Sequence, residues 1–133
     1  YLQFEHVQLR ERRHLLPESV ESFQATATAE RQAMLNRLRT LGLISDEEAD
    51  DADSHIPQIV EAMHAMLRKS PSLLIQAALV DGVGERRTQN QPGTSDQYPN
   101  WRIPLADEHG RVVHTDEVFD LPRVKSLAAI MDA

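Results

Sequence analysis

Residues 73–80 form a nearly continuous apolar run, Leu-Leu-Ile-Gln-Ala-Ala-Leu-Val, bounded by Pro71 and Gly82. Its length and its boundaries predict a strand that is buried on both faces. Strands of this kind belong to parallel sheets and barrels, where helices cover the outside. A lone buried strand cannot satisfy its own backbone hydrogen-bonding groups. We therefore expect the neighbouring strands to come from a longer protein or from a second copy of the chain.

Three amphipathic helices are predicted around this strand. Apolar residues recur at helical spacing over about residues 18–41, 55–69 and 121–132. Gly42 follows the first of these segments and suits a helix C-terminus. Ser45 and Glu48 match a capping box that opens a short additional helix. Residues 1–16 fit a strand and a helical turn equally well. The expected fold over residues 1–133 is mainly α with one or few short strands.

Composition restricts the classes of function. The net charge is −7, from 21 acidic and 14 basic residues, and an acidic surface repels nucleic acid. No apolar run is long enough to predict a membrane span, and no signal peptide follows Tyr1. The absence of cysteine excludes disulfides and thiolate metal sites, which fits the cytoplasm. Because the chain begins with Tyr1 instead of methionine, we expect it to be a piece of a longer protein.

Residues 81–104 follow the predicted strand and are rich in glycine, proline, asparagine, glutamine, threonine and serine. Loops of this length without regular structure are usually functional or disordered. In (β/α)₈ barrels the active site is built from the loops at the C-terminal ends of the strands. This loop is therefore the segment in which we look for a functional site.

Two linked motifs lie in this loop: Asn90-Gln91-Pro92-Gly93-Thr94, followed by Tyr98-Pro99-Asn100-Trp101-Arg102. They resemble the motif near the C-terminus of 4-α-glucanotransferases (amylomaltases, or disproportionating enzymes), which reads approximately N-x-P-G-T, a short polar stretch, then P-N-W-R. Residues 78–87 look like the last barrel strand of that family and its exit, and residues 5–12 like the stretch after its final catalytic motif. The resemblance covers most of the chain, but only residues 90–102 are specific.

The resemblance implies a (β/α)₈ barrel of which this chain is the C-terminal portion. It also implies transfer of α-1,4-glucan segments to another sugar by a retaining mechanism, which needs two carboxyl groups. The family uses an Asp nucleophile, a Glu acid/base and a second Asp in a Thr-His-Asp motif. None of these motifs can be placed here, so the catalytic residues are expected upstream of Tyr1. His114-Thr115-Asp116 has the wrong order, and we interpret it as a coincidence.

By the same resemblance, we expect substrate contacts from Asn90, Pro92, Gly93 and Trp101. An asparagine amide both donates and accepts hydrogen bonds, as a sugar hydroxyl requires. Glycine permits a turn or a close backbone approach to a ligand. A tryptophan ring can stack on a sugar, although an anchoring role for Trp101 within the loop is about equally plausible. No histidine or acidic spacing indicates a metal, and no cofactor is implied.

The expected partners are α-1,4-glucans, with neither nucleic acid nor membrane. Alone, the chain should be inactive and supply one wall of a sugar site, and its uncovered apolar faces favour a homo-oligomer. The alternative is a non-catalytic helical domain that binds carbohydrate or another protein.

Overall fold

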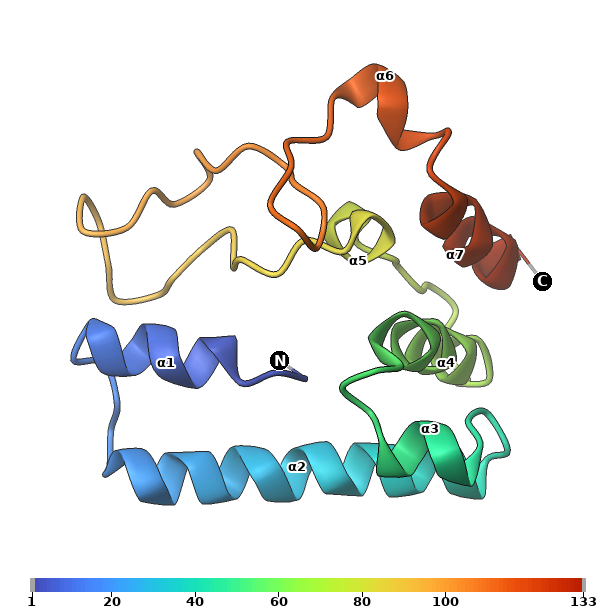
Figure 1. Ribbon diagram of the computed structural model, residues 1–133, viewed down its shortest axis with the longest axis horizontal. Coiled ribbons are helices and arrows are strands. Elements are labelled where there is room, and N and C mark those ends of the chain that lie inside the picture. Colours follow the sequence, from blue (N-terminus) through green and yellow to red (C-terminus); the bar gives the residue numbers. More distant parts are fainter. Residues whose placement is uncertain (1, 133) are drawn as a thin grey trace. The chain divides into compact units, whose positions relative to one another are not determined.

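The computed structural model describes residues 2–132, and this part of the chain is mainly helical (Figure 1). Its helices are α1 (Glu5–Arg12), α2 (Val20–Thr40), α3 (Asp46–Asp50), α4 (Ile56–Arg68), α5 (Leu79–Val83), α6 (Thr115–Val118) and α7 (Pro122–Asp132). Helices α2, α4 and α7 occupy the segments whose apolar spacing is helical. The ambiguous N-terminal segment contains α1, so its helical interpretation is the one that the structure adopts.

The predicted strand at residues 73–80 is wrong for this structure. Residues 72–78 have no regular secondary structure, and Leu79 already begins the short helix α5. Leu73 and Leu74 are 105% and 89% exposed. A strand forms only where a neighbouring strand pairs with its backbone, and residues 2–132 supply none to this segment. Apolar composition alone therefore does not make this run a strand.

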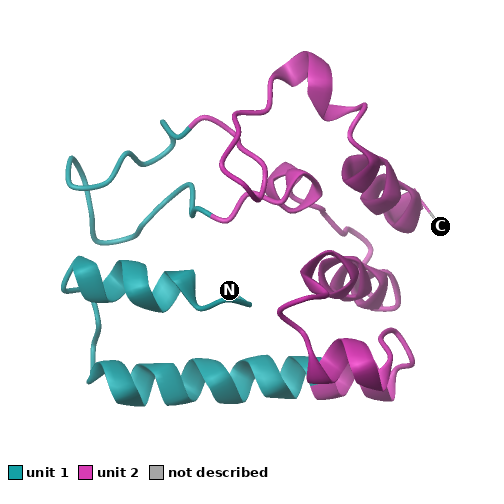
Figure 2. Cartoon of the chain, in the orientation of Figure 1, with its two compact units in different colours: residues 1–35, 87–103 teal, residues 36–86, 104–133 magenta. Residues whose placement is uncertain are grey.

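The chain divides into two compact units, which are described separately (Figure 2). Unit 1 consists of residues 1–35 and 87–103. Unit 2 consists of residues 36–86 and 104–133. The polar loop, defined as residues 87–103, thus packs with the N-terminal segment.

Unit 1 contains α1 and most of α2. Val7 of α1 is 2% exposed, and Leu35 of α2 is also 2% exposed, so both helices contribute to its core. The Arg10 guanidinium lies 5.4 Å from the centroid of the Phe23 ring, a cation–π contact between α1 and α2. These contacts make the two helices one scaffold within unit 1.

Unit 2 begins with the end of α2, where Leu38 is completely buried. Gly42 has φ +66°, and its left-handed backbone allows the chain to leave the helix, as predicted. Further along the chain, α7 packs against α4 and α5. A core cluster forms where Val83 of α5 meets Val113 and Val118.

Residues 107–110 form a turn in unit 2. The Gly110 N–H donates to the Asp107 carbonyl at 2.9 Å, and Ala106 and Val112 form an isolated antiparallel bridge on either side. Within residues 2–132, no helix has the length and apolarity needed to cross a membrane.

The capping box of α3 is confirmed and provides a first prediction. The Glu48 N–H donates to the Ser45 hydroxyl at 3.1 Å, and the Ser45 N–H donates to the Glu48 carboxylate at 2.7 Å. Replacing Ser45 with alanine should lower the free energy of unfolding by about 1 kcal/mol, because the N-cap acceptor is lost. Urea denaturation followed by circular dichroism measures this change, and an unchanged midpoint would contradict it.

The same box predicts a pH dependence for Glu48→Gln. The Ser45 backbone N–H, and then its hydroxyl, lower the pKa of Glu48 below its ordinary value of 4.5. The stabilisation by Glu48 is therefore complete above pH 4.5 and is lost as the pH falls through the lower folded-state pKa. Glu48→Gln should be less stable than the unmodified chain at neutral pH, and this deficit should disappear once the pH lies below the folded-state pKa of Glu48. A deficit that persists at low pH would show that the charge is irrelevant.

The exposed leucines predict self-association of the 133-residue chain when it is produced alone. Leu73 and Leu74 present adjacent apolar side chains on an unpaired backbone, a combination that favours pairing with another chain. Light scattering should detect oligomers that the double variant Leu73→Ser, Leu74→Ser no longer forms. Phe119→Ser is the control, because Phe119 is also 72% exposed but lies outside this segment. A monomeric unmodified chain would contradict the prediction.

Candidate functional site

Asn100 organises the polar loop through both ends of its side-chain amide. Its Oδ1 accepts a hydrogen bond from the Gln91 backbone N–H at 2.7 Å. Its Nδ2 donates to the Thr94 hydroxyl at 3.0 Å and to the Thr94 carbonyl at 3.3 Å. An amide offers this donor and acceptor pair on one planar group, which neither an aspartate nor a leucine does. Asn100 therefore joins the second motif of the loop to the first.

Two further hydrogen bonds close the loop near its base. The Tyr98 hydroxyl donates to the Thr88 carbonyl at 2.6 Å, and Tyr98 is only 8% exposed. The Trp101 backbone N–H donates to the Gln89 carbonyl at 2.8 Å. Thr88 and Gln89, at the start of the loop, are thus held beside Tyr98 and Trp101 of the second motif.

The turn at Pro92-Gly93 is stabilised from within the first motif. The Thr94 hydroxyl donates to the Gln91 carbonyl at 2.6 Å, and the Thr94 backbone N–H reaches the same oxygen at 3.3 Å. Gly93 has φ +83°, a left-handed conformation that costs other residues free energy. Pro92 and Gly93 are both exposed, so the outer face of this turn is open to solvent.

Asn90 and Trp101 are the two predicted contact residues with side chains directed to solvent. Asn90 is exposed, and its backbone carbonyl accepts a hydrogen bond from the Thr88 hydroxyl at 3.0 Å. Trp101 is 76% exposed and has φ +58°, which is unusual for a bulky residue. Strained backbone of this kind persists only where surrounding contacts enforce it. Because Trp101 is this exposed, its ring is not buried as an anchor among residues 2–132.

Gln89 carries an unsatisfied group in the same loop. Its Nε2 atom is buried and has no hydrogen-bond acceptor among residues 2–132. Buried polar atoms are nearly always paired in native proteins. The site therefore contains one donor whose acceptor is not part of the described chain.

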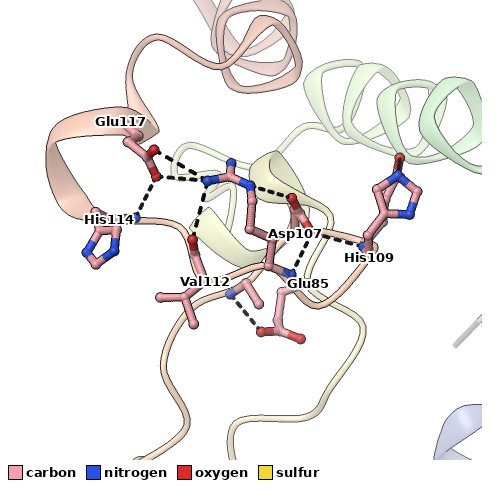
Figure 3. A network of polar contacts seen from close by, with 9 residues as sticks. Glu85, Asp107, His109, Val112, His114 and Glu117 are labelled. Carbon is pink, nitrogen blue, oxygen red and sulfur yellow. Dashed lines mark hydrogen bonds and ion pairs between the residues drawn. The ribbon is translucent and has the colours of Figure 1, made fainter.

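A separate polar network lies in unit 2, around Arg111 (Figure 3). The Arg111 guanidinium contacts Asp107 Oδ2 at 3.2 Å and Glu117 Oε2 at 3.2 Å. The Ala106 N–H donates to Glu85 Oε2 at 3.0 Å. These interactions connect the turn at residues 107–110 with α6 and with the exit from α5.

The two carboxylates that contact Arg111 both have pKa values below the ordinary values of their residue types. Burial raises the pKa of Asp107, but hydrogen bonds from the Arg111 and His109 backbone N–H groups and from the Arg111 guanidinium outweigh it, and the net shift is downward. The His114 backbone N–H and then Arg111 lower the pKa of Glu117. A retaining glycosyl transfer needs a carboxyl group that stays protonated until it donates. Asp107 and Glu117 do not meet this requirement.

The His114-Thr115-Asp116 string has a structural position. The His114 backbone N–H donates to Glu117 Oε2 at 3.1 Å, so this string forms the start of the four-residue helix α6. Asp116 therefore lies in the first turn of α6. Among residues 2–132, no three His, Asp or Glu side chains are grouped to hold a metal.

The structure thus distinguishes the outward-facing residues from those that build the loop. Asn90, Pro92, Gly93 and Trp101 all lie in unit 1, on one loop, and all are exposed. Sequence analysis did not single out Asn100 or Tyr98 as structural residues, although both lie in the second motif. The available signal was their type, since asparagine and tyrosine often hydrogen-bond to backbone groups in loops.

Comparison with known proteins identifies relatives of this chain. The family profile described as 4-alpha-glucanotransferase matches residues 14–109, which include the whole polar loop. Curated 4-alpha-glucanotransferases from Mycobacterium bovis and Mycobacterium tuberculosis are each 41% identical over 133 residues, covering 100% of this chain and 18% of their own length. The chain therefore spans less than a fifth of those relatives.

A solved structure gives the same result in three dimensions. The crystal structure of amylomaltase from Corynebacterium glutamicum matches with a TM-score of 0.87 and 32% sequence identity. The match covers 98% of this chain and 19% of the amylomaltase chain. Agreement in the profile, in overall sequence and in backbone shows that this chain belongs to the 4-alpha-glucanotransferase family.

Proposed function

We propose that this chain is the C-terminal portion of a 4-α-glucanotransferase, in which the polar loop forms one wall of the glucan site. The observation that carries this proposal is the construction of the loop. Asn100 and Tyr98 hold its backbone from within, while Asn90 and Trp101 remain exposed. A loop with a rigid interior and an amphipathic outer face is suited to bind a sugar chain.

Each exposed residue has a distinct role in this proposal. The Asn90 amide donates to one sugar hydroxyl and accepts from another. The Trp101 ring stacks on the apolar face of a glucose unit, and its strained backbone keeps the ring directed outward. The exposed face of the Pro92-Gly93 turn lets the ligand approach the backbone closely.

The remainder of the protein supplies the chemistry. Retaining glycosyl transfer needs a carboxylate nucleophile and a carboxylic acid. Asp107 and Glu117 are held by Arg111 and serve a structural purpose, so the catalytic acids are proposed to lie in the part of the enzyme that this chain does not include. The chain alone is therefore inactive, and its substrates as part of the enzyme are α-1,4-glucans.

The rest of a (β/α)₈ barrel also explains two unsatisfied features of the chain. The backbone and leucine side chains of residues 73–74 are exposed in a segment with strand-like composition. The buried Gln89 Nε2 has no acceptor within residues 2–132. We propose that the N-terminal part of the enzyme covers Leu73 and Leu74 and supplies the missing acceptor.

The activity is tested with maltotriose. The full-length protein should convert it into glucose and longer malto-oligosaccharides, measured by chromatography of the products, and the 133-residue chain alone should not. Product formation by the chain alone would show that catalytic groups lie within it. No product from the full-length protein would refute the proposed activity.

The two sugar contacts are tested in the full-length protein. Trp101→Ala should raise KM for maltotriose about tenfold, the factor that corresponds to 1.4 kcal/mol. Asn90→Ala should raise it about fivefold, because two hydrogen bonds of about 0.5 kcal/mol each are lost. Phe119→Ala is the matched control, since Phe119 is an equally exposed aromatic residue in unit 2. Equal effects of Trp101→Ala and Phe119→Ala would contradict a sugar contact at Trp101.

Asn100→Asp tests whether the loop must be held in place for binding. The change keeps the acceptor for the Gln91 N–H but places a second oxygen next to the Thr94 carbonyl, where Nδ2 now donates. The resulting loss of the donor and repulsion between oxygens should destabilise the loop by about 1–3 kcal/mol. We expect faster amide hydrogen exchange at residues 89–101 together with a higher KM. A raised KM without faster exchange would argue against this structural role.

The alternative function, a non-catalytic carbohydrate-binding or interaction domain, predicts a different outcome. Such a domain would bind maltoheptaose on its own with micromolar affinity, which isothermal titration calorimetry of the 133-residue chain would detect. The proposed function predicts weak or no heat, because the other walls of the site are missing.

A further inference from the structure

Leu15 lies directly against the Pro92-Gly93 turn. A Cβ atom built on Gly93 would be 3.2 Å from Leu15 Cδ2 and 3.9 Å from Leu15 Cδ1. Leu15 therefore occupies the side of Gly93 from which any other residue would project its side chain. The opposite side of the turn is exposed to solvent. Glycine at this position thus permits both the left-handed backbone and the contact with Leu15.

The end of α1 fixes the position of Leu15. The His14 N–H donates to the Glu11 carbonyl at 3.0 Å, and the Leu15 N–H donates to the Arg10 carbonyl at 2.9 Å. His14 has φ +55°, in the left-handed region. This is the hydrogen-bond pattern of a Schellman motif, with His14 at the C′ position and Leu15 at the C″ position. The backbone of Leu15 is therefore held by its own hydrogen bond and by that of the adjacent His14, and its placement does not depend on a flexible linker.

The turn is consequently held from two directions. Asn100 binds the residues on either side of it through Gln91 and Thr94. Leu15 lies next to Gly93, on the side to which a Cβ atom would project, and supplies an apolar neighbour in addition to the hydrogen bonds of the loop. Without Leu15, the hydrogen bonds of Asn100 would leave the turn able to sink into the vacated space.

We propose that Leu15 is a positioning residue for the glucan site. Its side chain fixes the position of the Pro92-Gly93 turn and, through the turn, the position of Asn90. This inference rests on the proposed function of the polar loop. Leu15 does not touch the sugar, and it acts only through the loop. If the loop samples several positions, only the molecules with the loop in the binding-competent position bind the glucan. Loss of Leu15 lowers this fraction and therefore weakens the apparent affinity.

The experiment compares variants of the full-length protein by two readouts. Leu15→Ala should raise KM for maltotriose roughly tenfold and change kcat less than about twofold, because only the competent fraction of the loop decreases. Amide hydrogen exchange, followed by mass spectrometry, should become faster in the peptide that covers residues 89–101. Leu15→Met should restore both values, since methionine has a similar volume and refills the contact.

Two controls separate positioning from general destabilisation. Val118→Ala truncates a side chain that is 2% exposed in the core of unit 2, and it should leave both exchange in residues 89–101 and KM unchanged. His14→Gly relieves the left-handed backbone at C′ and should preserve the position of Leu15, with unchanged KM and exchange.

The two readouts also keep this inference distinct from the proposed function. If Leu15→Ala leaves exchange in residues 89–101 unchanged, Leu15 does not position the loop, whatever the activity. If the unmodified protein shows no activity on maltotriose, the proposed function fails, and faster exchange in Leu15→Ala would still establish the structural support. A lower kcat with an unchanged KM would overturn the assignment to substrate positioning.

Discussion

The side-chain amide of Asn100 is the interaction on which the polar loop depends. One planar group accepts from the Gln91 N–H and donates to Thr94, so it replaces the backbone pairing that a loop without strands does not have. Two further hydrogen bonds complete the loop. Tyr98 is buried to reach the Thr88 carbonyl, and Trp101 takes a left-handed backbone while its N–H binds the Gln89 carbonyl.

The structure shows which segments of the chain satisfy their backbone hydrogen bonds without the rest of a longer protein. Helices satisfy their backbone groups locally, and α2 and α4 therefore form wherever their apolar spacing indicates. A strand needs a neighbour, and residues 72–78 have none among the described residues. The same apolar composition that favours a buried strand leaves Leu73 and Leu74 exposed here. The difference between helix and strand is thus a difference in where the hydrogen-bond partners come from.

This difference also explains how far the sequence predicts the fold and the site. The capping box at Ser45 and the helix end at Gly42 are local signals, and both agree with the structure. The position of Leu15 beneath Gly93 depends on packing between segments about eighty residues apart in sequence, so no local pattern predicts it. In the loop, the motif identifies the relevant residues but does not distinguish the asparagine that faces outward, Asn90, from the one that builds the loop, Asn100.

The distribution of roles within the motif has a physical reason. A binding loop must pay little conformational entropy when the ligand arrives, and side chains that are already hydrogen-bonded to backbone achieve this before binding. The polar side chains of Thr94, Tyr98 and Asn100 are engaged within the loop in this way. The same holds for the main chain of Trp101, which its N–H fixes by a hydrogen bond to the Gln89 carbonyl. Under the proposed function, rigidity in this loop favours binding, and the hydrogen bonds within the motif maintain that rigidity.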